Sequence, residues 1–212
     1  MARLPVGRRT ASRAIGGRNS GGKALAWPIA PVIASRWTDL ELLLGERGGC
    51  GGCWCMTWRL PAARFERDKG ARNRAALRRL VETGPPPGVI AYDGDAPIGW
   101  CAVAPRAEYV RLSRSRVLEP FDDIPVWSVS CLFVARPFRR RGVSVALLRA
   151  AAAFAGEHGA RVVEGYPVVP YAEKMPDAFA WTGTVAAFLA AGYEEVARRS
   201  PRRPIMRCTV RR

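Results

Sequence analysis

The stretch that decides the fold runs VWSVSCLFV (126–134), ARPF (135–138), RRRGVS (139–144) and VALLRAAAAFAG (145–156). The first segment is a continuous apolar run with the length and residue types of a buried β-strand. The last segment places Leu147, Leu148, Ala151 and Phe154 on one face at helical spacing. The sequence therefore predicts a strand, a basic turn and an amphipathic helix in direct succession.

The basic turn between these two elements has the features of an anion-binding site. Arg139 precedes Gly142 by three residues, and the small residue Ser144 follows two positions later. Glycine lets the backbone approach a phosphate closely, and the free N–H groups of the first helical turn point at an anion there. Arginines add bidentate donors. The alternative is a solvated charge run that merely precedes a helix.

Further elements are predicted on both sides of this unit, and together they indicate one mixed α and β domain over residues 26–212. Asp93-Gly94-Asp95 supplies the positive backbone angles of a tight hairpin turn. We expect helices at 38–44, 69–83, 143–156 and 184–191, and strands at 88–92, 97–104, 126–134, 161–169, 193–198 and 205–210.

The first 25 residues are predicted to be a disordered basic extension, because residues 1–23 hold six basic residues and no acids and show little apolar periodicity. Arg8-Arg9 bears a faint likeness to a twin-arginine export signal, but the apolar run that follows it is weak. No stretch approaches the roughly 18 apolar residues of a membrane helix. We therefore expect a soluble, cytoplasmic protein with no membrane partner.

The formal net charge of +16 would suit a polyanionic partner. However, arginines are spread along the whole chain and form no stripe with exposed aromatic residues. Nucleic acid is therefore not the expected partner.

Two segments resemble the GNAT N-acetyltransferase superfamily over about residues 88–210. Residues 139–144 resemble its coenzyme-A loop, in which Arg or Gln is followed by two residues, Gly, any residue, then Gly or Ala; Ser144 departs mildly from this pattern. Residues AAFLAAGYEEV (186–196) are similar to its last helix and the Gly-aromatic entry to the next strand. The resemblance implies an α+β fold with a mixed, mostly antiparallel sheet flanked by helices, and a strand-turn-helix-strand unit that binds CoA.

The same resemblance implies the reaction and its partners: an acceptor amine attacks the thioester of acetyl-CoA directly in a ternary complex, with no covalent acyl-enzyme. The partners are then an acyl-CoA and an amine of a small molecule or protein; no metal is expected, and a homodimer is left open. The implied cofactor-binding residues are Leu132, Phe133 and Val134 for the thioester and pantetheine, Arg139, Arg140, Arg141, Gly142, Val143 and Ser144 for the pyrophosphate, and Phe188, where many relatives have a tyrosine.

Direct attack requires a neutral amine, so the site needs a route for a proton. Our candidates for this catalytic role are Glu164, Tyr171 and Ser130. Each could equally be a packed or solvated residue. Phe188 has no hydroxyl, which leaves the proton donor unidentified.

The segment GGCGGCWCMTWR (48–59) crowds three thiols into six residues. C-x2-C spacing suits zinc, but a closed site usually needs four ligands and a fourth is missing. Cys-Trp-Cys-Met also resembles a subset of bacterial GNAT proteins. Trp54, Met56 and Trp58 could form an apolar wall for the acceptor or ordinary core. Two alternatives to catalysis remain: a non-catalytic CoA-binding module, and a thiol-metal or redox protein centred on residues 50–55.

Overall fold

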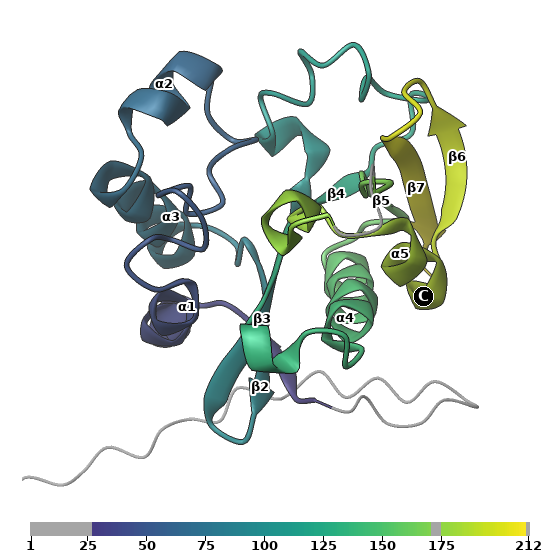
Figure 1. Cartoon of the computed structure of the whole chain (residues 1–212). Coiled ribbons are helices and arrows are strands. Elements are labelled where there is room, and N and C mark those ends of the chain that lie inside the picture. The colour runs from purple at the N-terminus through teal and green to yellow at the C-terminus, as the bar shows by residue number, and fades with distance from the viewer. Residues whose placement is uncertain (1–26, 171–174, 211–212) are drawn as a thin grey trace, which may run out of the picture.

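The computed structural model describes residues 27–170 and 175–210, which contain a single seven-stranded sheet (Figure 1). Its strand order is β1-β2-β3-β4-β5-β7-β6, and every neighbouring pair is antiparallel except β4 and β5. The strands are β1 (Ile29–Pro31), β2 (Gly88–Asp93), β3 (Ala96–Pro105), β4 (Trp127–Val134), β5 (Val162–Gly165), β6 (Glu194–Arg198) and β7 (Pro204–Thr209). The predicted mixed, mostly antiparallel sheet is confirmed.

Helices cover both faces of the sheet. Figure 1 shows α1 to α3 on one side and α4 with α5 on the other. Their bounds are α1 (Trp37–Leu44), α2 (Ala62–Arg67), α3 (Ala71–Thr83), α4 (Val143–Glu157) and α5 (Val185–Ala191). No helix within 27–170 or 175–210 is long and apolar enough to cross a membrane.

Most predicted elements lie within a few residues of their expected bounds. The hairpin between β2 and β3 turns at Gly94 and Asp95, within the predicted Asp93-Gly94-Asp95 segment, and Gly94 has the positive φ of 57°. Two short elements, β1 and α2, were not predicted, because three to six residues carry too little periodicity to identify. The expected extension at 1–25 lies outside the described residues.

Among the described residues, two large apolar clusters pack against the sheet, one on each face, and a smaller third one includes Ala104 of β3 and Ile205 of β7. Leu147 and Phe154 of α4 pack with Val129 of β4 in the first, and Trp37, Leu77 and Trp100 lie in the second. Helix α4 lies very close to β3, because a Cβ added to Gly99 would come within 2.9 Å of Val143 and 3.0 Å of Leu147. This contact fixes where α4 begins relative to the central strands.

A bulge interrupts the regular pairing of β4 with β3. Ala102 pairs with Cys131 and Val103 pairs with Val129, so Ser130 is an extra residue in the β4 strand. As a result Cys131 packs toward α1 and α3, while Leu132 packs toward α4.

The two parallel strands separate just beyond this bulge. Strand β4 pairs with β5 only from Trp127 opposite Val163 to Val129 opposite Gly165. Beyond that point residues 130–134 continue without a β5 partner, so the sheet is open at its middle.

Candidate active site

The basic turn joins the open end of β4 to α4. Helix α4 begins after Gly142, which adopts a left-handed conformation with φ 84°, and no side chain caps the helix. Arg140 also has a positive φ of 58°. Because the first N–H groups of a helix have no partner within it, this 15-residue helix directs free donors and the positive end of its dipole at the turn. The arrangement suits a phosphate group.

Arg139 ties this turn to the open strand, since its Nε donates a hydrogen bond of 3.0 Å to the carbonyl of Val134. The basic turn and the open end of β4 are therefore joined directly on the α4 side of the strand.

The unpaired edge of β4 carries the backbone groups predicted to hold a thioester. The N–H of Leu132 points away from β3 and donates to the carbonyl of Trp181 over 2.7 Å. Strand alternation places the N–H of Val134 on the same edge and turns that of Phe133 toward β3. Of the three predicted residues, Leu132 and Val134 thus present donors to the gap, and the first is engaged by Trp181.

Phe188 lies at the base of the gap between β4 and β5. It is fully buried, and its ring meets the edge of Tyr193 at 4.9 Å between centroids. A Cβ on Gly165 would approach the Phe188 ring to 2.2 Å, and one on Gly183 would approach it to 2.7 Å. The structure therefore brings Phe188 beside Leu132 of β4 as a packed ring, and its cofactor-binding role stays a prediction.

Glu164 occupies a different environment from the one expected of a proton acceptor. It is fully buried on β5, and its two carboxylate oxygens bind Arg106 Nη1 at 2.8 Å and Arg207 Nε at 2.8 Å. Tyr166 donates a further hydrogen bond of 2.6 Å to Oε1. A carboxylate with both oxygens held by cations suits an anchor between strands. Tyr171, another predicted catalytic residue, lies outside the described residues.

Ser130 lies at the β4 bulge, where its buried Oγ has no hydrogen-bond partner. It is close enough to Tyr109 to lower the pKa of that phenol, although burial outweighs this effect and raises the pKa to about 12. Tyr109 and its neighbour Arg59 were not predicted as site residues. Nothing in their local sequence marks them, because residues 59, 109 and 130 meet only after folding.

The predicted acceptor wall divides into two places. Met56 lines a groove of about 800 Å³ between the α2–α3 region and Glu108, together with the basic residues Arg59, Arg64, Arg72 and Arg79. Trp58 contacts Trp181 in a tilted arrangement, with centroids 5.9 Å apart and ring planes at 34°. Trp58 is thereby near the open edge of β4, because the Trp181 carbonyl binds the Leu132 N–H, whereas Met56 shares a buried cluster with Cys131 of β4.

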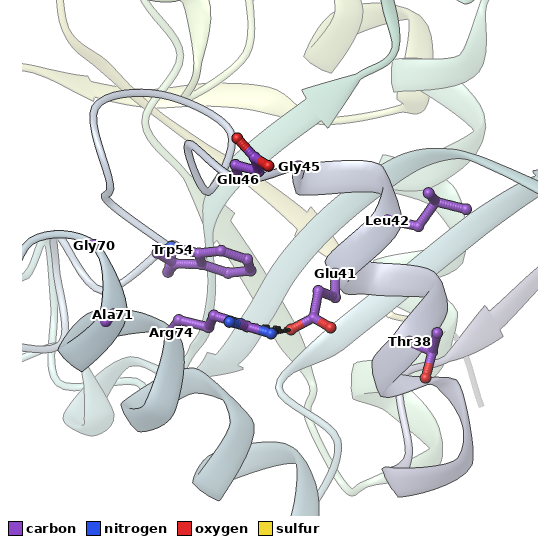
Figure 2. Close-up of a pocket in the computed structure, with 9 residues that line it drawn as sticks. All are labelled: Thr38, Glu41, Leu42, Gly45, Glu46, Trp54, Gly70, Ala71 and Arg74. Atoms are coloured by element: carbon purple, nitrogen blue, oxygen red, sulfur yellow. Dashed lines mark hydrogen bonds and ion pairs between the residues drawn. The ribbon is translucent and has the colours of Figure 1, made fainter.

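Trp54 lies elsewhere, in a second cavity of about 520 Å³ beside α1. Figure 2 shows its ring above the ion pair of Arg74 and Glu41, whose atoms are 2.5 Å apart. Its side chain is 2% exposed, so most of the ring is core. The structure thus separates Trp54 from Met56 and Trp58.

The cysteine segment packs against β4 on the face opposite to α4. Cys55 Sγ lies 3.3 Å from Cys131 Sγ and accepts a hydrogen bond of 3.2 Å from Trp100 Nε1. All six cysteines are free thiols. Within the described ranges, no three His, Cys, Asp or Glu side chains are grouped so that they could hold a metal ion.

Strands β4 and β5 part beside a helix whose first N–H groups have no side-chain cap, which leaves a central gap that ends at the basic turn. The sequence matches the model of the acetyltransferase (GNAT) family over residues 54–174, more than half of the 212 residues. The chain belongs to this GNAT acetyltransferase family, whose members carry out acyl transfer from acetyl-CoA.

Solved structures share the fold at low sequence identity. A GNAT-family acetyltransferase from Listeria monocytogenes has a TM-score of 0.52 at 9% identity and covers 91% of this chain and 98% of its own. One from Streptococcus agalactiae has a TM-score of 0.51 at 11% identity, covering 88% and 96%. A GNAT-family protein from Desulfovibrio desulfuricans has a TM-score of 0.50 at 14% identity, covering 88% and 100%. No curated protein matches this sequence significantly.

Proposed function

We propose that this protein transfers an acetyl or other short acyl group from acyl-CoA to a primary amine, by direct attack in a ternary complex. The observation that carries the proposal is the open edge of β4 leading directly into the anion-binding turn at the start of α4. Pyrophosphate and thioester sites at the two ends of one gap match the two ends of the CoA arm.

The cofactor lies along β4 in this proposal. Arg139 to Ser144 bind the pyrophosphate through the first-turn N–H groups and the arginine side chains. The N–H groups on the open edge polarise the thioester carbonyl, and such preorganised donors stabilise the charge that develops during attack. Trp181 gives up the Leu132 N–H when the thioester uses that group.

The acceptor reaches the thioester from the α1–α3 side in this proposal. Met56 and the arginines of the groove lie on that side, and Trp58 borders it. Among the catalytic candidates, Ser130 lies at the reaction centre, while Glu164 positions β5 through Arg106 and Arg207. The free thiols suit a reducing compartment, which supports a cytoplasmic location.

The direct test measures release of the CoA thiol from acetyl-CoA in the presence of spermidine, kanamycin or free lysine, with an amine-free control. Amine-dependent release with acetylated product by mass spectrometry is expected. Tight acetyl-CoA binding without turnover of any amine would favour the non-catalytic CoA module, for which the lack of a hydroxyl on Phe188 is the supporting observation.

A redox function of the cysteine segment is the other candidate, because Cys55 and Cys131 place their sulfur atoms 3.3 Å apart. Treatment with oxidised glutathione followed by peptide mapping checks it. A Cys55–Cys131 disulfide in a protein that does not bind acetyl-CoA would favour this function over acyl transfer.

A further inference from the structure

Buried polar atoms without partners gather at one place in the molecule. In residues 27–170 and 175–210, five buried side-chain polar atoms lack a hydrogen-bond partner, and four of them belong to Trp58, Arg59, Tyr109 and Ser130. A buried polar atom that is left unsatisfied destabilises the folded protein. A cluster of four therefore calls for an occupant, either ordered water or a reacting group.

These groups form a line from the central strand to the acceptor groove. Ser130 lies at the β4 bulge, close enough to the Tyr109 hydroxyl to lower the pKa of that phenol. The Arg59 guanidinium lies over the Tyr109 ring, with its Cζ 4.7 Å from the centroid. Its Nη1 binds Glu108 Oε2 at 2.5 Å, and both Arg59 and Glu108 line the groove. Glu108 is the outer end of the line, since its side chain is 38% exposed.

Burial keeps the Tyr109 hydroxyl protonated at neutral pH, because it raises the pKa of this phenol. Burial raises its pKa to about 12, the Glu108 carboxylate and the Cys101 thiol act in the same direction, and Arg59 and Ser130 oppose them. Tyr166 packs in the same apolar cluster as the Tyr109 ring. A phenol that stays protonated can still carry a proton along a chain, because it gives up its own hydrogen as it accepts another.

The reaction has a matching need. A primary amine is largely protonated at neutral pH and must lose one proton before its lone pair can attack. On a buried strand that proton needs a path to solvent, and the Glu108 carboxylate, which binds Arg59 and is 38% exposed, is a proton acceptor at the outer end of this cluster.

We propose that Ser130 and Tyr109, joined by water, relay a proton from the acceptor ammonium to Glu108, with Arg59 as the positioning residue. This inference rests on the proposed acyl transfer. Ser130 Oγ takes a proton from the ammonium nitrogen and passes its own hydrogen to Tyr109, which passes its own through water to the Glu108 carboxylate.

The transfer then balances without a further reactant. The neutral nitrogen forms the C–N bond to the thioester carbon, and the C–S bond breaks with its electron pair on sulfur. The second nitrogen proton is lost as the amide forms, the CoA thiolate gains a proton from solvent, and Glu108 returns its proton to solvent.

Tyr109→Phe tests the relay, because it removes the hydroxyl and keeps the ring under Arg59. With acetyl-CoA and the fastest amine among spermidine, kanamycin and lysine, we expect kcat at pH 7 to fall about 100-fold, within the range for general acid–base groups. The KM for acetyl-CoA should stay within about twofold, since the cofactor lies on the other face of β4. The fold-loss should shrink as the pH rises toward the pKa of the amine, because solvent then supplies the neutral nucleophile.

Tyr92→Phe is the matched control, since its hydroxyl binds Asp39 at 2.8 Å away from this cluster; its kcat should stay at the wild-type value. Ser130→Ala should show the same pH-dependent loss, and the double variant should be little worse than either single variant because both break one relay. A loss in Tyr109→Phe that is equal at every pH, or a kcat above one third of wild type, would overturn the relay and leave the acyl transfer standing.

A high-resolution crystal structure checks the relay without any acceptor. Ordered waters that join Ser130 Oγ, Tyr109 and the Glu108 carboxylate are expected, and a dry cluster would contradict the relay. Wild-type protein that turns over none of the three amines would overturn the proposed transfer, and the relay with it.

Discussion

Glu164 shows why a residue's identity alone does not fix its role. A lone glutamate in a strand after the cofactor helix suits a general base, yet folding places it between Arg106 and Arg207 with both oxygens bound. Taking one partner out of a buried ion network leaves the others unpaired, which costs more than the network contributes.

Glu164→Gln should therefore lower the free energy of unfolding by about 3 kcal/mol in urea denaturation, because two nearly buried guanidinium groups lose their shared charge. Glu195→Gln is the control, since the Glu195–Arg198 pair is more than one-third exposed and should cost less than about 1 kcal/mol. Equal losses in the two variants would show that Glu164 is not an anchor.

At the same scale, sequence predicted the residues whose role depends on local backbone. Gly142 and the arginines before it are adjacent in the chain, so their pattern is visible without a structure. Arg59, Tyr109 and Ser130 are separated by 50 and 21 residues and meet only in the folded protein. No local pattern links them, which is why two of the three were missed.

Strand β4 is the element on which the proposed reaction depends. Its predicted bounds differ from the observed bounds by one residue, because a long apolar run flanked by turns constrains a buried strand well. The bulge at Ser130 and the early separation from β5 were not predictable, since register depends on partner strands. The segment around Trp181, which binds the open edge, was missed for the same reason.

Because the Trp181 carbonyl accepts the Leu132 N–H, a thioester that uses this group must displace that carbonyl and disturb the contact between the Trp181 and Trp58 rings. We expect acetyl-CoA to change the tryptophan fluorescence of the wild-type protein. Trp181→Phe should lose most of this change, whereas Trp127→Phe, whose ring packs on Phe154 of α4, should retain it. An identical change in Trp181→Phe would place the thioester on Val134 alone.

On the scale of the whole molecule, the two faces of the sheet carry different parts of the proposed site. The basic turn leads into α4 on one face, and the groove lies between α2, α3 and Glu108 on the other; in the proposed function the first binds the cofactor and the second the acceptor. This division follows from a fold class that the sequence indicated, because strand, turn and helix patterns agreed with one another along most of the chain. Part of the positive charge behind the net charge of +16 is concentrated in the groove, which Arg59, Arg64, Arg72 and Arg79 line.

Buried tyrosines give the whole fold an alkaline limit. Burial raises the pKa of Tyr109 to about 12 and the pKa values of Tyr166 and Tyr193 above the usual value. The unfolded chain loses these protons near pH 10, so it binds fewer protons than the folded protein above that pH. Their contribution is complete below about pH 10 and is lost as the pH rises further.

The free energy of unfolding should thus fall steadily between about pH 10 and pH 12, as measured by urea denaturation at each pH. Tyr109→Phe should show a shallower fall, since one of the three groups no longer titrates. A slope unchanged by this variant would mean that Tyr109 ionises alike in the folded and unfolded states.

The most direct test of the central claim is titration calorimetry of acetyl-CoA with wild type, Gly142→Ala and Gly159→Ala. Both glycines flank α4 with φ of 84° and 86°, and an added Cβ meets nothing within 4 Å at either position, so the backbone strain is matched. We predict stoichiometric binding to wild type, affinity weakened at least about tenfold in Gly142→Ala, equivalent to about 1.4 kcal/mol, and wild-type affinity in Gly159→Ala. No binding to wild type, or equal affinity in all three proteins, would contradict acetyl-CoA binding at the turn before α4.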